Sequence, residues 1–227
     1  MTLTQDRKLE LRDRFLRVDT ANVADILDEM GYPDCGLSSS FWPIRERLEK
    51  MAGWAYTIRG QMTPYPGTGD PKKMQAVSGL TPGHLSVWSG GGAEGVCFFG
   101  ELIARGMQYR GCVGALVDGG IRDIEWLARM NFPVYARYRT PVQSIGRWEV
   151  NAWQVDVYLP GATTARVRVR PDDFLLADFD GAVLIPQEIA QEVLARAEAL
   201  TEKERHIRED LESGMSLPDV LSKYGHV

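Results

Sequence analysis

The 227-residue chain has little of what marks several large classes of protein. Its three cysteines, Cys35, Cys97 and Cys112, are far apart and form no C-x-x-C pair, so no disulfide framework is indicated. The three histidines form no H-E-x-x-H sequence, which argues against a zinc hydrolase. Lys and Arg number 26 against 31 Asp and Glu, and the net charge of −5 lacks the basic excess of a nucleic-acid binder. We therefore expect small molecules or proteins as partners, and no nucleic acid.

Long apolar runs are missing as well. No segment approaches the about 20 apolar residues that a membrane-spanning helix needs, and the first ten residues lack the apolar stretch of a secretory signal. Two of the cysteines lie in apolar runs, where a thiol behaves as a small hydrophobe. These features predict a protein of the reducing cytoplasm without a membrane partner. No repeat, low-complexity tract or separating linker is present either, which predicts a single domain over residues 1–227.

What is present is the composition of an ordinary globular domain, with 44% hydrophobic and 25% charged residues. A chain of this length buries roughly 70 to 75% of the surface that its unfolded form exposes. Its core therefore needs no metal to hold it, and any metal would serve chemistry.

The order of the expected elements predicts an α/β fold. N-terminal helices are expected within about 5–31 and a C-terminal helical extension within about 187–227. The remaining helices are expected at 101–109 and 124–129, and the strands at 53–58, 85–88, 96–99, 112–117, 133–136, 147–158, 165–169, 174–178 and 182–185. The β-α-β-α-β order in the middle of the chain favours right-handed crossovers and a parallel layer. Residues 32–50 and the Pro- and Gly-rich stretch 60–72 are expected to be loops.

Chemistry is expected where two successive strands end. Helix 101–109 begins directly after a strand and Gly100, so its free N–H groups offer a carboxylate or phosphate site. The next strand leads to Arg122 and Asp123 at the same edge. Arginine can grip a carboxylate with two hydrogen bonds, and two carboxylates, Glu101 and Asp123, can hold a hard divalent cation. Together these groups would bind and polarise a 2-oxo acid.

Each of these residues also has a purely structural interpretation. Glu101 can be an acid favoured by the helix dipole in the first turn. Arg122 and Asp123, as sequence neighbours, point to different sides unless the backbone turns, and such pairs are usually solvated surface. The glycines around them can simply allow tight turns and close packing.

The combined spacing resembles a known signature. Glu101, twenty further residues and then Arg122-Asp123, at the end of the glycine-rich run that starts at Gly111, resemble the acidic-x20-Arg-Asp pattern of the class II pyruvate aldolases. These are 4-hydroxy-4-methyl-2-oxoglutarate / 4-carboxy-4-hydroxy-2-oxoadipate aldolases, a family that includes the regulator of ribonuclease activity A. Four other stretches resemble the family, and the likeness extends over nearly the whole chain from about residue 18: 20–31, 51–57, 132–136 and 177–186.

The resemblance implies an α-β-β-α sandwich like the swivelling phosphohistidine domain, assembled as a homotrimer or homohexamer with active sites at subunit interfaces. It implies that Asp123 ligates Mg²⁺ or Mn²⁺ directly and that Glu101 holds the metal through water. It also implies that Arg122 and the backbone after Gly100, at Glu101 and Leu102, bind pyruvate. Aspartate is commoner than glutamate at position 101, so the longer side chain here leaves the geometry around the metal open.

A carboxylate from a neighbouring subunit is also implied, and Glu198 and Glu202 on the long C-terminal helix are the candidates. Arg137, Arg139 and Arg147 are candidates to bind a second substrate carboxylate, although surface ion pairs explain them equally well.

Two functions from different classes follow. The first is a divalent-metal-dependent lyase that cleaves a 4-hydroxy-2-oxo acid to pyruvate and a second carbonyl compound, and that also decarboxylates oxaloacetate. The alternative is a non-catalytic regulator that binds a ribonuclease or another protein through its oligomer surface.

Overall fold

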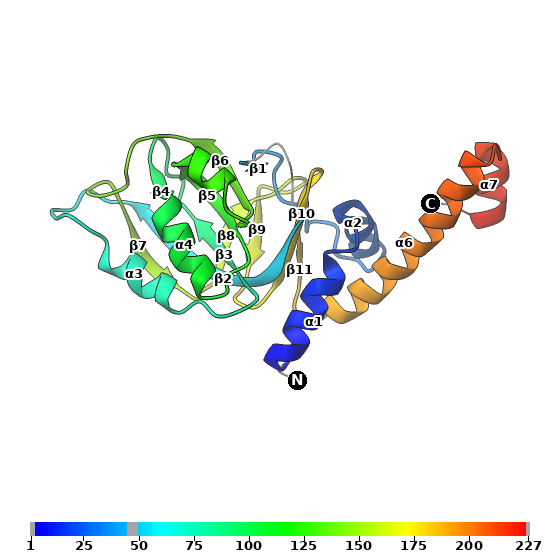
Figure 1. Cartoon of the computed structure of the whole chain (residues 1–227), viewed down its shortest axis with the longest axis horizontal. Helices are drawn as coiled ribbons and strands as arrows, with labels where there is room; N and C mark the ends of the chain where they lie inside the picture. Colours follow the sequence, from blue (N-terminus) through cyan, green and yellow to red (C-terminus); the bar gives the residue numbers. More distant parts are fainter. Residues whose placement is uncertain (1–2, 45–49, 226–227) are drawn as a thin grey trace.

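The computed structural model describes residues 3–44 and 50–225 and has a mixed α/β fold (Figure 1). Within the described residues, nine strands form one sheet in which β2, β3, β5 and β6 run parallel in the centre and the other main-path strands pair antiparallel at the edges. The order along the sheet is β1-β6-β5-β3-β2-β10-β11, while β4 pairs with β5 and β7 with β2. The predicted α/β class is therefore correct, whereas the likeness to the swivelling phosphohistidine domain stays a prediction.

The strands of this sheet are β1 Trp42–Pro43, β2 Met51–Met62, β3 His84–Ser89, β4 Cys97–Phe99, β5 Ala115–Ile121, β6 Val134–Arg139, β7 Trp148–Trp153, β10 Phe174–Asp178 and β11 Gly181–Ile185. A separate antiparallel hairpin is formed by β8 Val157–Pro160 and β9 Arg166–Val169. The helices are α1 Gln5–Phe15, α2 Thr20–Glu29, α3 Pro71–Ser78, α4 Glu101–Tyr109, α5 Ile124–Ala128, α6 Ala190–Glu212 and α7 Leu217–Tyr224. None of the helices in these two described ranges is long and apolar enough to cross a membrane.

Side-chain alternation along the central strands separates the apolar core into layers. Leu116 of β5 packs toward hairpin β8–β9, whereas Val117 packs toward α3, α4 and α5 on the other face. Helices α1, α2 and α6 cover a third apolar cluster at the β10–β11 end of the sheet (Figure 1). The sheet is thus covered on both faces, and the carboxyl ends of β4 and β5 stay at its rim.

The predicted loop 60–72 is shorter than expected. Strand β2 continues to Met62, and α3 begins at Pro71. Asp70 caps this helix by accepting a hydrogen bond from the Lys73 N–H, and proline at the first helical position lacks only a donor that would be unpaired there. The Asp-Pro pair was therefore a helix-start signal that the density of prolines and glycines concealed. A second predicted loop, 32–50, contains β1, and its residues 45–49 lie outside the described residues.

The predicted strand 112–117 is displaced toward the carboxyl end. Strand β5 starts at Ala115 and runs through Asp118, Gly119 and Gly120 to Ile121, all buried. A methyl group on Gly119 would overlap the Phe98 ring, and one on Gly120 would overlap the Tyr138 ring. These two glycines therefore admit aromatic side chains against the strand instead of forming a turn.

The apolar stripe of α6 covers its own subunit. Val193, Leu194 and Ala197 are fully buried against α1, α2 and the sheet of the same chain. This part of the helix therefore has its packing partners within the same chain. Only the far part of α6 and α7 extends away from the rest of the molecule (Figure 1).

Two truncations should separate these parts of the C-terminal extension. Ending the chain after Pro186 removes Val193 and Leu194, each worth about 1.5–3 kcal/mol of buried apolar surface, and uncovers α1 and α2. Since domains are stable by only about 5–15 kcal/mol, we expect no cooperative thermal unfolding. Ending the chain after Thr201 keeps these contacts, and we expect a cooperative transition. Circular dichroism melts of the two truncated chains test this, and equal behaviour would contradict the assignment of the stripe to the subunit core.

Candidate active site

The candidate site forms where β4 and β5 end side by side. Phe99 and Ile121 are paired in parallel register, so the residues that follow them, Gly100 and Arg122, leave the sheet at the same place. The Arg122 N–H donates to the Phe99 carbonyl at 3.3 Å. Helix α4 starts directly after Gly100, and α5 starts directly after Asp123. The two strand ends were predicted to meet, and the structure brings them together.

An unusual backbone conformation turns Asp123 toward α4. Its φ of 60° and ψ of 37° lie in the left-handed region, which non-glycine residues seldom adopt and which Asp tolerates better than most. The Asp123 carboxylate does not cap its own helix but accepts a hydrogen bond from the Glu101 N–H at 3.1 Å. Because of this backbone turn, the neighbouring Arg122 and Asp123 side chains do not point to different sides.

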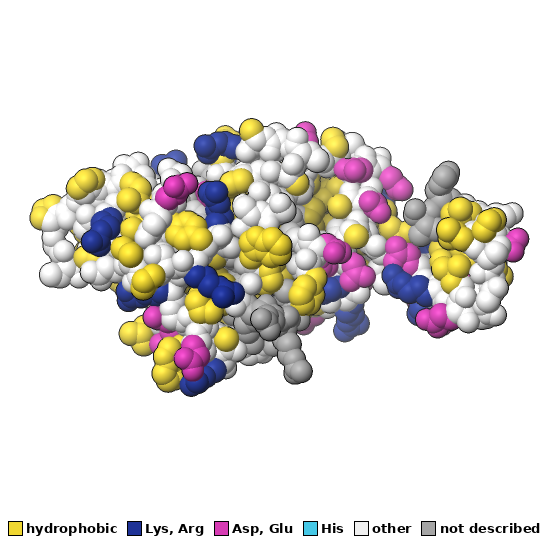
Figure 2. Space-filling model, turned by 90° about the horizontal axis from the view of Figure 1, so that it is seen from above, with side chains coloured by type: hydrophobic (Ala, Val, Ile, Leu, Met, Phe, Trp, Pro, Cys, Tyr) yellow, Lys and Arg dark blue, Asp and Glu magenta, His cyan; other side chains and the backbone are white. Residues whose placement is uncertain are grey.

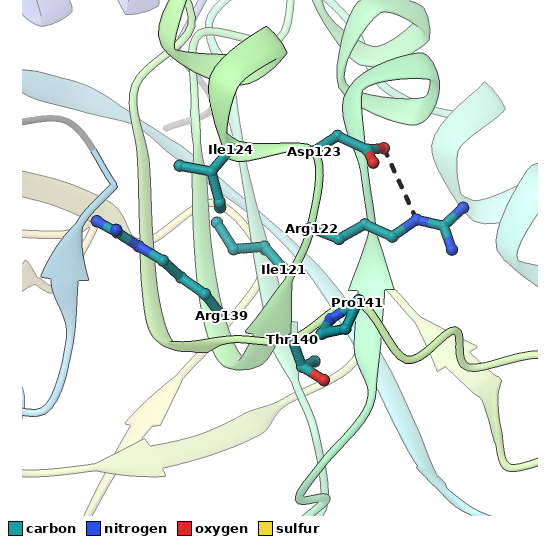
Figure 3. Close-up of a pocket in the computed structure, with 7 residues that line it drawn as sticks. All are labelled: Ile121, Arg122, Asp123, Ile124, Arg139, Thr140 and Pro141. Carbon is teal, nitrogen blue, oxygen red and sulfur yellow. Dashed lines mark ion pairs between the residues drawn. The ribbon is translucent and has the colours of Figure 1, made fainter.

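Arg122 lies beside this carboxylate. Its Nε is 3.7 Å from Asp123 Oδ2, and the close-up shows the two side chains on the same side of the loop (Figure 3). Both line a pocket of about 230 Å³ together with Gly100 and Leu102 at the start of α4. The first N–H groups of a helix have no acceptor within the helix, and the dipole makes this end positive. The pocket is therefore suited in size and charge to a small carboxylic acid.

The three other arginines considered for a second carboxylate do not converge on this pocket. Arg139 lines a second pocket of about 450 Å³, which Arg122 and Asp123 also line. Its side chain points away from Arg122, across Ile121 and Ile124, and donates to the Ile44 carbonyl (Figure 3). Arg137 forms an ion pair with buried Asp118 at 3.2 Å. Arg147 donates to the Gln143 carbonyl from an exposed position.

The backbone and the side chain of Glu101 have different partners. Its N–H holds Asp123, whereas its carboxylate forms an ion pair with Arg105, one turn further along α4. To hold a cation through water, this carboxylate must exchange or share the Arg105 contact. Leu102, the next residue of the first turn, is 80% exposed, so its side chain faces outward while its N–H belongs to the helix start.

The donor set matches a hard cation that keeps much of its water. Among the residues that the structure describes, no three Asp, Glu, His or Cys side chains are grouped as a ready metal cage. Two carboxylates lie near the helix start, those of Asp123 and Glu101. Mg²⁺ is often bound by one or two carboxylates plus waters and substrate oxygens, and Mn²⁺ prefers the same oxygen ligands. The oxygen donors of these residues are therefore of the type that Mg²⁺ or Mn²⁺ prefers, and they do not form the nitrogen and sulfur set of a typical zinc site.

One residue of the pocket was missed in the sequence. Lys73 of α3 lies at the pocket wall, and its ammonium group donates to the Phe98 carbonyl and to the Ser144 hydroxyl, each at 2.9 Å. Burial lowers the pKa of Lys73, the nearby charge of Asp70 opposes this shift, and the charge of Arg122 adds to it. Sequence reasoning missed Lys73 because no helix was predicted there.

The two candidates for the carboxylate from a neighbouring subunit have partners within their own chain. Glu198 binds Arg14 of α1 through two hydrogen bonds of 2.8 and 2.6 Å, which lower the pKa of Glu198. Glu202 binds Arg205 on the same helix. Their role in a neighbouring site stays a prediction.

Comparison with known proteins gives one family. Residues 20–184 match the model of the RraA-like family, described as Aldolase/RraA. A 4-hydroxy-4-methyl-2-oxoglutarate aldolase of Thermus thermophilus is 33% identical over 105 residues, which cover 46% of this chain and 60% of that protein. A Halalkalibacterium halodurans protein provisionally given the same name is 25% identical over 191 residues, 84% of this chain and 83% of its own. An uncharacterized Methanocaldococcus jannaschii protein, MJ0644, is 32% identical over 133 residues, 59% of this chain and 61% of its own length. The matched part of this chain thus covers less than two thirds of the length of two of these three relatives.

Solved structures of similar fold include a protein described as a member of the RraA family. An uncharacterized Pseudomonas syringae pv. tomato protein superposes with a TM-score of 0.80 at 27% identity, covering 93% of this chain and 96% of that one. Streptomyces coelicolor RraAS2, described as an unusual member of the RNase ES inhibitor RraA protein family, superposes with a TM-score of 0.73 at 26% identity, covering 88% and 96%. Sequence relatives are thus named for a lyase activity, whereas this structural neighbour is named for ribonuclease inhibition.

Proposed function

The chain belongs to the Aldolase/RraA family, and from this premise we propose that it is a metal-dependent class II aldolase that cleaves a 4-hydroxy-2-oxo acid to pyruvate. The observation that carries the proposal is the meeting of Arg122, Asp123 and the start of α4 around one small pocket. Relatives named as aldolases support the lyase class. The second product is a carbonyl compound whose structure depends on the substrate.

Arg122 and the start of α4 bind the pyruvate half of the substrate. The guanidinium group holds the carboxylate with two parallel hydrogen bonds, and the N–H groups of the first turn add a positive environment. Mg²⁺ or Mn²⁺, when bound by Asp123, supplies a Lewis acid for the 2-oxo group. Glu101 accepts the proton of the 4-hydroxyl group through water.

The same residues serve cleavage and decarboxylation. In the retro-aldol direction the 4-hydroxyl proton leaves, a carbonyl forms at C4, and the C3–C4 bond breaks with its electrons passing to the pyruvate enolate. In oxaloacetate the corresponding bond breaks with release of CO₂ and gives the same enolate. Arg122 stabilises this negative charge, and a proton then returns to C3. Oxaloacetate decarboxylation is accordingly proposed as a second activity of the same site.

A substrate screen tests the proposal. The protein is incubated with 4-hydroxy-2-oxo acids or oxaloacetate in Mg²⁺ or Mn²⁺, and pyruvate is measured by a coupled dehydrogenase. We expect pyruvate release that stops with EDTA and returns when the metal is restored. No metal-dependent release from any of these acids above the rate without protein would refute the lyase.

Glutamine at position 101 should slow turnover without damaging the fold. Glu101→Gln keeps the backbone donor to Asp123 but removes the charge and the proton-accepting group. We expect a loss of about 10²-fold in kcat, at the lower end for general acid–base catalysis, because Arg105 already shares this carboxylate. Steady-state pyruvate release measures it, with Glu125→Gln on α5 as the exposed control. A loss below tenfold would leave Glu101 as a helix-dipole residue.

A second function is favoured by the likeness to RraAS2. In this alternative the chain is a non-catalytic regulator that binds a ribonuclease or another protein through its oligomer surface. A pull-down with purified RNase ES, the enzyme in that relative's description, and inhibition of its cleavage of a model RNA test this function directly. Inhibition that survives Asp123→Asn would separate it from the lyase site.

The assembly is proposed to be a homotrimer or homohexamer with active sites at the interfaces. Support comes from the far end of the C-terminal extension, where Leu211, Leu217 and Leu221 are exposed. Figure 2 shows hydrophobic side chains gathered at this end of the molecule. Light scattering of the full chain and of the chain ending after Thr201 measures the assembly, and a full-length monomer with full lyase activity would refute it.

A further inference from the structure

Lys73 is a buried cation at the wall of the candidate pocket. Its side chain comes from α3, which lies on the same face of the sheet as α4, and the residue is only 4% exposed. Its two hydrogen bonds of 2.9 Å end on neutral oxygens, the Phe98 carbonyl and the Ser144 hydroxyl. The Trp148 ring lies 5.3 Å away and adds a cation–π contact.

This charge is poorly compensated within the subunit. A buried ammonium group is costly unless a counter-charge balances it. The charge of Asp70 favours the charged form of Lys73, but the two Asp70 oxygens accept hydrogen bonds from the backbone N–H groups of Lys73 and Val150. Within residues 3–44 and 50–225, no salt bridge joins Lys73 to a carboxylate. Arg122, the other cation at this pocket, adds repulsion. An anion bound in the pocket would relieve both charges.

Lys73 also joins two segments that form the pocket. Phe98 belongs to β4, two residues before Gly100 and the start of α4, and its neighbour Phe99 accepts the Arg122 N–H. Ser144 lies on the segment that is bridged in parallel to β4 at Cys97 and Gln143, and Gln143 and Ile145 of this segment line the same pocket. The ammonium group therefore adds a side-chain link, at the pocket itself, between the strand that leads to the start of α4 and the segment paired with it.

We propose that Lys73 is a positioning residue for the bound 2-oxo acid. Its ammonium group links the two pocket segments and supplies, in addition to Arg122, a second fixed positive charge at the pocket. The inference rests on the proposed function for the identity of the acid, but the predicted effect is on anion binding. It can therefore be measured without turnover.

Oxalate, a small planar dianion that resembles the pyruvate enolate, is the probe. Titration calorimetry in buffer with Mg²⁺ compares wild type with Lys73→Met, which keeps the length of the side chain and removes the charge. We expect the oxalate affinity to fall by about 10- to 100-fold, the range for losing a charged hydrogen-bonding group. Lys72→Met is the matched control, because Lys72 is the exposed neighbour on the same helix. Its affinity should equal that of wild type.

A second variant separates positioning from folding. Ser144→Ala removes one acceptor of Lys73 and leaves the charge, so it should weaken oxalate binding by about 3- to 10-fold, the effect of one ordinary hydrogen bond. Circular dichroism melts verify that each variant is folded. Should Lys73→Met fail to fold, Ser144→Ala decides alone.

Three outcomes overturn the inference: no oxalate binding by wild type, unchanged affinity in folded Lys73→Met, or unchanged affinity in Ser144→Ala when Lys73→Met does not fold. A changed melting temperature with unchanged affinity would make Lys73 purely structural. If wild type binds oxalate and the Lys73 effect is seen, but no acid is cleaved, the lyase proposal fails and the anion site stands.

Discussion

Asparagine in place of Asp123 should abolish metal-dependent pyruvate release while the subunit stays folded. The change removes the negative charge that is proposed to bind the cation. Asparagine tolerates the left-handed backbone at this position, and its side-chain oxygen can still accept the Glu101 N–H. A bound cation stabilises developing charge by several kcal/mol, so kcat should fall by more than about 10³-fold. Pyruvate release across a Mg²⁺ titration, with a thermal melt in parallel, measures both expectations.

A matched acidic control is available nearby. Asp118→Asn changes a buried carboxylate that belongs to the adjacent strand and binds Arg137, away from the pocket. The amide of asparagine can still accept the hydrogen bond from Arg137, and position 118 lies outside the pocket, so turnover should change by less than about tenfold. Full metal-dependent activity in Asp123→Asn would end the metal model, and equal losses in both variants would mean that Asp123 acts only through the fold.

A single methyl group at Gly100 should close the candidate site. Gly100 has φ −132° and ψ −161°, which any residue can adopt, so Gly100→Ala introduces no backbone strain. The new Cβ would overlap Asp123 Oδ2 and lie 3.1 Å from Arg122 Cγ, forcing both side chains to move. A shift of about 1 Å in a catalytic group can cost 10²-fold, and loss of a positioned hydrogen-bond donor costs about 10²–10³-fold more. We expect turnover to fall by more than about 10³-fold and oxalate binding to be lost.

Gly106→Ala on the same helix is the control. An added Cβ at Gly106 has nothing within 4 Å, and alanine favours the middle of a helix by about 1 kcal/mol. This variant should melt at a higher temperature and keep full activity. A Gly100→Ala protein that also keeps full activity would show that the site lies elsewhere.

Much of the secondary structure was predictable because its signals are local. The N-terminal helices within about 5–31 and the helix that follows Gly100 were predicted from the sequence pattern, and α1, α2 and α4 lie within those ranges. Helix α3 was not predicted, since the prolines and glycines before it outweighed its Asp-Pro start. Strand β5 was ended too early, because Gly119 and Gly120 are typical of turns in sequence but here lie against aromatic rings.

By itself the sequence determined the α/β class and the two strand ends that carry the candidate site. Hydrophobic periodicity and the alternation of strands with helices depend on near neighbours in the chain. The parallel order then requires that the residues after β4 and β5 meet at one edge.

Only the tertiary structure decided how these residues are oriented and what completes their pocket. The left-handed turn at Asp123 and the divergence of Arg139 from Arg122 depend on how the elements pack at the sheet edge. Lys73 reaches the pocket across more than twenty residues of sequence to Phe98 and about seventy to Ser144. Side-chain contacts between such distant segments leave no periodic trace in the chain, because they arise from the docking of whole elements and from the burial that it produces.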